Sequence, residues 1–204
     1  MKALLLIDIQ NDFLPTGALP VPEGDRVIAV AKNCMPKFEL VVATQDWHPA
    51  DHGSFAANHP GKKPGEVIEL AGLSQILWPV HCVQGTPGAD FAPGLNRTGI
   101  HHVIQKGTNR EIDSYSGFFD NGHKQATGLH AFLQERRVTE LFIMGLATDY
   151  CVKFTALDAR QLGYAVTLIE DGCRGVNLKA GDAKTEIAEM RHAGVGVAHS
   201  GLMI

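Results

Sequence analysis

Residues 141–163, LFIMGLATDYCVKFTALDARQLG, constrain the fold of this chain more than any other stretch. The four apolar residues at its start have the length and bulk of a buried strand, and Gly145 is expected to end that strand. Thr148 is expected to cap the first turn of a helix. This helix should end at Gly163, because glycine commonly follows the last turn of a helix. A buried strand followed closely by a helix is typical of α/β proteins.

Cys151 lies in the first turn of this expected helix. A thiol there is close to free backbone N–H groups and to the positive end of the helix dipole, and both lower its pKa from about 8.5. Asp149 in the same turn suits that dipole. The same N–H groups can hold the oxyanion that forms when sulfur attacks a carbonyl. We therefore interpret Cys151 as a nucleophile, with a small hydrophobic residue packed under a sheet as the alternative.

Composition is that of an ordinary globular protein, with 45% hydrophobic and 20% charged residues in 204. The formal net charge of −4, without a basic block, argues against nucleic acid or an anionic membrane as a partner. Asp8 interrupts the N-terminal apolar run, which is then too short for a signal peptide or a membrane span. The four cysteines are widely spaced and form no CxxC motif, so we expect reduced thiols in a cytoplasmic protein.

Strand-like and helix-like patterns alternate along the chain. Apolar runs occur at residues 2–9, 40–43, 102–105 and 165–169, with a weaker one at 195–198, and helical patterns at 23–37, 124–136 and 179–192. This alternation predicts a doubly wound, mainly parallel sheet with helices on both faces. In such sheets, ligands bind outside the carboxyl ends of the strands.

Side chains that can take part in catalysis follow four of the expected strands. They are Asp8, Asp46, Lys106 and Cys151. Taken singly, Asp8 could cap the next loop and Lys106 could be solvated. Together, an acid, a lysine and a thiol form a nucleophilic set, in which Asp8 takes the thiol proton and returns it to a leaving amine. Lys106 would stabilise the thiolate and the carboxylate. The backbone N–H groups of Ala147 and Cys151 would hold the oxyanion.

A possible metal site follows the second strand. Asp46 and His48 are two residues apart, so they point to the same side of an extended chain, and His52 and His81 follow. Each alone is typical of a polar surface; one carboxylate with two or three imidazoles suits zinc, iron(II) or manganese, with zinc favoured. Calcium prefers cages made only of oxygen. Cys82 could also bind a metal, but its apolar neighbours favour a buried structural role.

Residues 49–99 differ in composition from the rest, with six of the ten prolines and eight glycines. A segment of this length without regular structure is usually functional in a compact domain. We expect residues 1–204 to form a single domain, with this loop-rich insertion covering the site.

Six motifs, in order, carry a family resemblance: LLLIDIQNDF, VVATQDWHPADHGSF, WPVHCVQGTPGADF, QKG, DSYSGFFDNG and MGLATDYCVKFTALDA. They resemble the nicotinamidases, also called pyrazinamidases, of the isochorismatase-like cysteine hydrolases. The resemblance implies the isochorismatase-like hydrolase fold and the hydrolysis of nicotinamide to nicotinate and ammonia in NAD salvage, through a thioester on Cys151. Pyrazinamide is implied as a further substrate.

The resemblance also implies roles for individual residues. Those that match the catalytic triad are Asp8, Lys106 and Cys151. Those that match the ligands of one divalent metal ion are Asp46, His48 and His81, and His52 matches a histidine that ligates in some members. Those that match aromatic residues around the pyridine ring are Phe13, Trp78 and Tyr115. Leu146 and Ala147 match a pair joined by a cis peptide at the oxyanion and substrate site, and Tyr150 stands where some relatives have histidine.

Two other interpretations compete with a nicotinamidase. One is another enzyme of the superfamily, such as an N-carbamoylsarcosine amidase-like hydrolase or an isochorismatase, which lacks the full metal set or the cysteine. The other is a non-catalytic metal-binding or redox-sensing protein in which Cys151 is merely oxidisable. The only partner that the residues indicate is the small-molecule substrate nicotinamide, and the sequence leaves homo-oligomer formation open.

Overall fold

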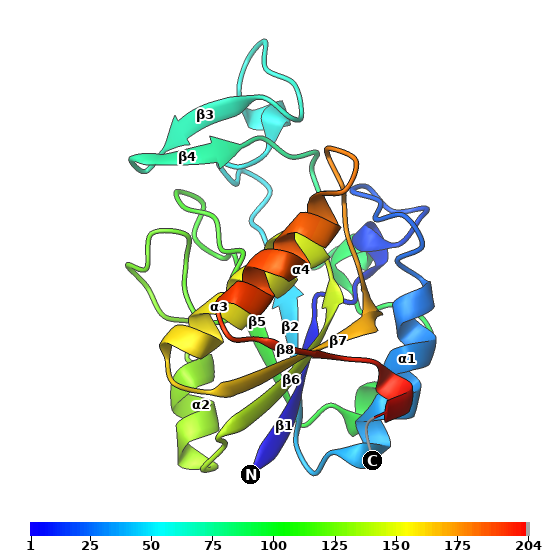
Figure 1. The fold of residues 1–204 in the computed structure, drawn as a ribbon. Helices are drawn as coiled ribbons and strands as arrows, with labels where there is room; N and C mark the ends of the chain where they lie inside the picture. The colour runs from blue at the N-terminus through cyan, green and yellow to red at the C-terminus, as the bar shows by residue number, and fades with distance from the viewer. Residues whose placement is uncertain (203–204) are drawn as a thin grey trace.

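The computed structural model describes residues 1–202, and a six-stranded sheet runs through its centre (Figure 1). The strands are β1 (Lys2–Ile7), β2 (Val41–Asp46), β5 (His102–Lys106), β6 (Glu140–Leu146), β7 (Ala165–Arg174) and β8 (Gly196–Ala198). Their spatial order is β5-β2-β1-β6-β7-β8, and every neighbouring pair is parallel. The chain therefore builds the sheet outward from its middle twice, first through β1, β2 and β5 and then through β6, β7 and β8. The order in which strands are added changes direction between β1 and β6, although all strands stay parallel.

Helices cover both faces of the sheet (Figure 1). They are α1 (Arg26–Cys34), α2 (Leu129–Glu135), α3 (Lys153–Gln161) and α4 (Asp182–His192). α1 lies on one face, whereas α3 and α4 pack together on the other with α2 beside them. The doubly wound, mainly parallel α/β fold expected from the alternating patterns is thus confirmed. Within residues 1–202, no helix is both long and apolar enough to cross a membrane.

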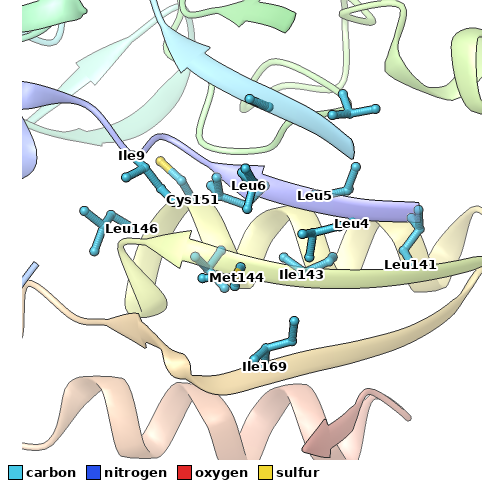
Figure 2. Close-up of a cluster of buried hydrophobic side chains, with 14 of the residues drawn as sticks. Leu4, Leu5, Leu6, Ile9, Leu141, Ile143, Met144, Leu146, Cys151 and Ile169 are labelled. Carbon is cyan, nitrogen blue, oxygen red and sulfur yellow. The ribbon is translucent and has the colours of Figure 1, made fainter. Parts of the chain in front are cut away.

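The central strands form because their side chains are apolar on both faces. Leu4, Leu5 and Leu6 of β1 are all fully buried, as expected for a parallel strand covered by helices on either side. Each such leucine contributes about 1.5–3 kcal/mol of hydrophobic free energy. Figure 2 shows them in one cluster with side chains of β6 and β7, and Cys151 lies at the end of that cluster. The core therefore extends up to the thiol of Cys151.

Gly145 has a different role from the one expected. It does not end β6, which continues to Leu146. Its φ is +130°, and a Cβ atom built there would lie 2.1 Å from the carbonyl oxygen of Ile7 in β1. The pairing of β6 with β7 also shifts register between Ile143 and Gly145. Glycine at this position therefore lets β6 stay against β1 where the two strands approach the site.

The segment 49–99 contains regular structure that the sequence analysis missed. Strands β3 (Val67–Leu70) and β4 (Leu73–Ile76) form an antiparallel hairpin apart from the main sheet (Figure 1). Ala71 and Gly72, which connect them, both have positive φ, as in the tight turns that suit hairpins. Alanine is an unusual residue in such a turn, and this is why the hairpin was not recognised.

The helix α2 is shorter than the expected span of 124–136. Residues 124–127 instead hydrogen-bond back to the preceding loop: Lys124 N–H donates to Asp120 Oδ1, and Thr127 Oγ1 donates to Gly117 O. The helix begins only after Gly128, whose φ is +93°. Local propensity is thus overridden by contacts within the loop that carries part of the site.

The close approach at Gly145 generates a stability prediction. Gly145→Ala should lower the free energy of unfolding by at least about 3 kcal/mol, because the added methyl group meets backbone atoms of Ile7 and the φ is strained. Gly163→Ala is the matched control: its φ is +91° but its Cβ would have free space, so about 1 kcal/mol should be lost. Urea unfolding measures both. Equal losses in the two variants would contradict the packing role of Gly145.

Candidate active site

One buried ammonium group connects the ends of four strands. Lys106 Nζ lies 2.9 Å from Asp8 Oδ2, donates to Asp46 Oδ1, donates to Ser114 O at 2.9 Å, and donates to Cys151 Sγ at 3.4 Å. Only 1% of Lys106 is exposed. The structure therefore brings together all four side chains that the sequence placed at strand ends.

A lysine suits this position because of the sheet order. Lys106 is paired in register with Asp46 on the neighbouring strand, whereas Asp8 lies one strand further on. Strands are about 4.8 Å apart, so a side chain from β5 must extend along the sheet edge to reach the end of β1. Burial alone lowers the pKa of Lys106, but Asp46 and Asp8 reverse this and hold it well above its usual value. The group stays charged inside the protein.

Asp8 has the environment of a buried base. It is fully buried with φ +47°, in the left-handed region, directly after β1. Thr44 Oγ1 donates to Asp8 Oδ1 at 2.6 Å. Burial raises the pKa of Asp8, although Lys106 opposes the shift. Carboxylate oxygens of Asp8 and Asp46 and the sulfur of Cys151 lie within 4.8 Å of one another, so the thiol lies next to both carboxylates.

The expectation of a lowered thiol pKa at Cys151 was wrong. Burial raises the pKa of Cys151 well above its usual value; Lys106 lowers it, but Asp8 and Asp46 raise it further. Burial, together with the two carboxylates, outweighs the effect of the helix start on the thiol pKa. The resting side chain is therefore a protonated thiol, and a base must remove its proton before it can attack.

The helix start itself differs from the expected N-cap. Residues 148–152 form a π-helical turn before α3, Ala147 occupies the cap position, and Thr148 makes no capping hydrogen bond. The N–H of Val152 donates to Ala147 O at 3.1 Å. The peptide bond between Leu146 and Ala147 is cis, as the resemblance implied. The wider turn places Cys151 at the bottom of a pocket.

Asp149 connects this turn to the segment that follows β7. Its carboxylate accepts hydrogen bonds from the N–H groups of Val176 at 2.9 Å and Asn177 at 2.7 Å, in the segment after β7. It therefore acts across the chain rather than on its own helix dipole. Val176 in turn lines the pocket.

A carboxylate and two imidazoles form a cluster next to Lys106. Asp46 Oδ2 lies 3.5 Å from His48 Nε2 and 3.8 Å from His81 Nε2, and all three side chains are buried. Burial by itself raises the pKa of Asp46, but Lys106 and His48 hold it well below its usual value, so the carboxylate is ionised. The three ligand-type atoms lie within 4.8 Å of one another, a spacing that fits one metal ion.

The histidine orientations also fit a metal. Nδ1 of His48 lies 2.9 Å from Gly107 O and Nδ1 of His81 lies 2.8 Å from Pro79 O, whereas Nδ1 of His52 lies 2.8 Å from Ser54 Oγ and accepts from the Ser54 N–H at 3.2 Å. The contacts of His48 and His81 with carbonyl oxygens are typical of the outer shell that orients metal-binding histidines. Burial, with His48 nearby, lowers the pKa of His52 to about 4. Its imidazole is neutral, the form that binds metals.

Gln10 holds Asp46 in place and was not identified from the sequence. Its Oε1 accepts from the Asp46 N–H at 2.8 Å, and its Nε2 donates to Asp46 O at 2.8 Å. Only its position two residues after Asp8 could have suggested this role. The two hydrogen bonds fix the end of β2 relative to β1.

Aromatic side chains form part of the wall of the pocket at Cys151. Its lining residues are Phe13, Leu19, Asp46, His48, Trp78, His81, Asp113, Tyr115, Ala147, Tyr150, Cys151 and Val176. The three aromatic residues assigned to substrate binding therefore face it, and two lining residues, Trp78 and His81, come from the segment 49–99. The hydroxyl of Tyr115 accepts from Trp78 Nε1 at 3.1 Å, which joins two of the walls. The side chain of Leu146 is instead fully buried in the core.

Comparison with known proteins gives the family. A model of the isochorismatase domain matches residues 2–200. The chain belongs to the isochorismatase family. This confirms the resemblance seen in the motifs.

Several relatives in the isochorismatase family match this chain over nearly its whole length and over nearly all of their own. The nicotinamidase of Escherichia coli is 53% identical over 95% of this chain and 92% of its own. A structure of a nicotinamidase/pyrazinamidase from Acinetobacter baumanii is 46% identical, with a TM-score of 0.95 and coverage of 98% of this chain and 96% of that chain. The pyrazinamidase of Pyrococcus horikoshii in complex with zinc is 37% identical, with a TM-score of 0.79 and coverage of 97% and 98%.

The position of Lys106 in this isochorismatase-family site predicts how the thiol titrates. Lys106→Met removes the positive charge that lowers the thiol pKa of Cys151, so the pH at which iodoacetamide alkylates Cys151 should rise by at least about one unit. The buried carboxylates also lose their partner, so about 3–5 kcal/mol of stability should be lost.

Lys153→Met is the matched control, because Lys153 is also paired with two carboxylates, those of Glu186 and Glu189. Its alkylation profile should equal that of the wild type. An unchanged profile in folded Lys106→Met protein would show that Lys106 does not act on the thiol.

Proposed function

We propose that this chain is a nicotinamidase, which hydrolyses nicotinamide to nicotinate and ammonia in NAD salvage and also accepts pyrazinamide. The observation that carries the proposal is the contact of Lys106 with both Asp8 and Cys151, at the bottom of an aromatic pocket with a metal-type cluster at its side. Sequence identity to nicotinamidases over nearly the whole chain supports it. The four cysteines are free thiols, in keeping with a cytoplasmic enzyme.

In the first half of the reaction, Asp8 accepts the proton of the Cys151 thiol while Lys106 stabilises the charge that forms on sulfur. The sulfur attacks the amide carbonyl carbon, and the electron pair of the C=O bond moves to oxygen. The N–H groups of Ala147 and Cys151 bind this oxyanion. Asp8 then gives the proton to the amide nitrogen, the C–N bond breaks, ammonia leaves, and a thioester remains on Cys151.

In the second half, water attacks the thioester carbonyl while Asp8 accepts one of its protons. The same N–H groups bind the second oxyanion. When the C–S bond breaks, the sulfur of Cys151 takes the proton back from Asp8 and nicotinate leaves. The raised pKa of Asp8 suits both directions of transfer, because a base of very low pKa would not accept a thiol proton.

Phe13, Trp78 and Tyr115 would hold the pyridine ring, and the hydrogen bond between Trp78 and Tyr115 keeps two of these side chains at a fixed separation. Flat aromatic walls suit a flat aromatic amide. Tyr150, which also lines the pocket, is the residue through which selectivity among analogues would differ from relatives with histidine there.

Asp46, His48 and His81, with His52, would hold one divalent ion, for which zinc is the first candidate and iron(II) or manganese the alternatives. The zinc-bound pyrazinamidase structure supports the choice of zinc. When bound, such an ion supplies a Lewis-acid partner for the ring nitrogen of the substrate. A metal cluster together with an intact thiol set favours a nicotinamidase over the isochorismatases and N-carbamoylsarcosine amidase-like enzymes, which lack one or the other.

The thioester mechanism predicts that Cys151→Ala abolishes ammonia release from nicotinamide and leaves the protein folded. Replacing one buried sulfur by hydrogen should cost only about 1–2 kcal/mol of stability. Cys34→Ala is the matched control, since Cys34 is fully buried in α1 and takes no part in the site. It should lose similar stability and keep full turnover. Turnover by folded Cys151→Ala protein would rule out covalent catalysis at this residue.

The metal proposal predicts a difference between two amides. Protein stripped with a chelator should lose activity on nicotinamide and regain it when zinc is added. Benzamide has the same shape and amide group but no ring nitrogen, so it should be a far poorer substrate of the metal-loaded enzyme. Full activity of the stripped protein, or equal turnover of the two amides, would show that no metal positions the substrate.

A further inference from the structure

Gln75 connects the hairpin of β3 and β4 to the rest of the molecule. The hairpin stands apart from the main sheet (Figure 1), and Gln75 lies in β4 opposite Ile68 of β3. Among residues 67–76, it is the only buried residue, with 3% of it exposed. A hairpin attached by packing alone would turn an apolar side chain inward. A buried amide costs free energy unless its hydrogen bonds are made, so the partners of Gln75 indicate its role.

The amide nitrogen of Gln75 faces the wall of the pocket at Cys151. Nε2 lies 3.0 Å from the hydroxyl oxygen of Tyr115, 3.1 Å from Asp113 Oδ2 and 2.7 Å from Ile76 O. These contacts fix the orientation of the amide, because its oxygen at the same place would meet a carboxylate and a carbonyl oxygen. Gln75 is therefore a donor to the loop that carries Tyr115.

The hydroxyl of Tyr115 is held from two sides. It accepts from Trp78 Nε1 at 3.1 Å and from Gln75 Nε2 at 3.0 Å. The ring of Tyr115 also contacts the rings of Tyr150 and Phe154, each with its centroid 5.4 Å away, but both of these side chains are partly exposed. Because its ring neighbours leave it room to move, the two N–H groups decide where Tyr115 stands.

We propose that Gln75 is a positioning residue for the substrate. It fixes the ring of Tyr115 relative to Trp78, and these two side chains form part of the pocket wall that would hold the pyridine ring. Gln75 lies behind Tyr115 and does not itself line the pocket. Without its amide, the Tyr115 hydroxyl would lose one of the two N–H groups that hold it. This inference rests on the function proposed above.

The first test separates positioning from attachment of the hairpin. Gln75→Met removes the amide and keeps the length of the side chain. Holding the ring contributes equally to binding of the substrate and of the transition state, so KM for nicotinamide should rise about fivefold while kcat stays within about twofold. A wild-type KM in folded Gln75→Met protein would overturn the inference. Gln75→Leu is the second variant if the first fails to fold, with the same values expected.

Lys124→Met is the matched control. Lys124 Nζ donates to Ala71 O at 3.3 Å, so it also joins the hairpin to the loop after β5, but at the turn of the hairpin. KM in this variant should stay within about twofold of the wild-type value. Equal increases in Lys124→Met and Gln75→Met would show that Gln75 only attaches the hairpin, which would overturn the inference.

The second test asks whether Gln75 acts through the hydroxyl of Tyr115. Tyr115→Phe removes this hydroxyl, so it should raise KM at least as much as Gln75→Met does. The double variant should then have the KM of Tyr115→Phe alone, within about twofold, because its second change has nothing left to act on. If the two increases multiply, Gln75 acts through another contact, such as that with Asp113, and the inference is wrong.

The inference and the proposed function fail in different ways. If wild-type protein releases no ammonia from nicotinamide, the proposed function is wrong and the inference falls with it. If the wild type releases ammonia and Gln75→Met has the same KM, the function stands and only the role of Gln75 is wrong. A higher KM in Gln75→Met, an unchanged one in Lys124→Met and a non-multiplicative double variant support both.

Discussion

The site depends on one buried ammonium group. Lys106 contacts Asp8, Asp46 and Cys151, and without it two buried carboxylates would face each other and a thiol with no positive charge between them. The sheet order makes this contact possible, since β5, β2 and β1 are neighbours and β6 follows on the other side. The reversal of chain direction between β1 and β6 leaves room at the carboxyl ends, which is where such folds bind ligands.

Asp46 belongs to both halves of the site. Its Oδ1 accepts from Lys106, and its Oδ2 faces His48 and His81. A change of charge at the metal cluster therefore changes the electrostatic environment of Lys106 and, through it, that of Cys151. Gln10 holds the backbone of Asp46 from the neighbouring strand end. The proposed chemistry and the proposed metal centre are thus one electrostatic unit and not two adjacent sites.

The parallel sheet and the site residues at its strand ends could be predicted from the sequence. Strands buried on both faces appear there as continuous apolar runs, and the polar side chains of the site follow directly after them. What could not be predicted depends on contacts between distant segments. The continuation of β6 past Gly145 could not be predicted, because it depends on the close approach of this residue to Ile7. The raised pKa of Cys151 results first from burial and then from the carboxylates of Asp8 and Asp46, which come from β1 and β2. Asp113 has no motif of its own, and only the structure shows that it is buried close to His52.

The covalent intermediate is the central claim, and partitioning with hydroxylamine tests it most directly. Hydroxylamine competes with water for a thioester and gives the hydroxamate in place of nicotinate. If both substrates pass through the same thioester on Cys151, nicotinamide and methyl nicotinate will give the same ratio of hydroxamate to nicotinate at each hydroxylamine concentration. Different ratios, or nicotinate as the only product at every concentration, would contradict the account.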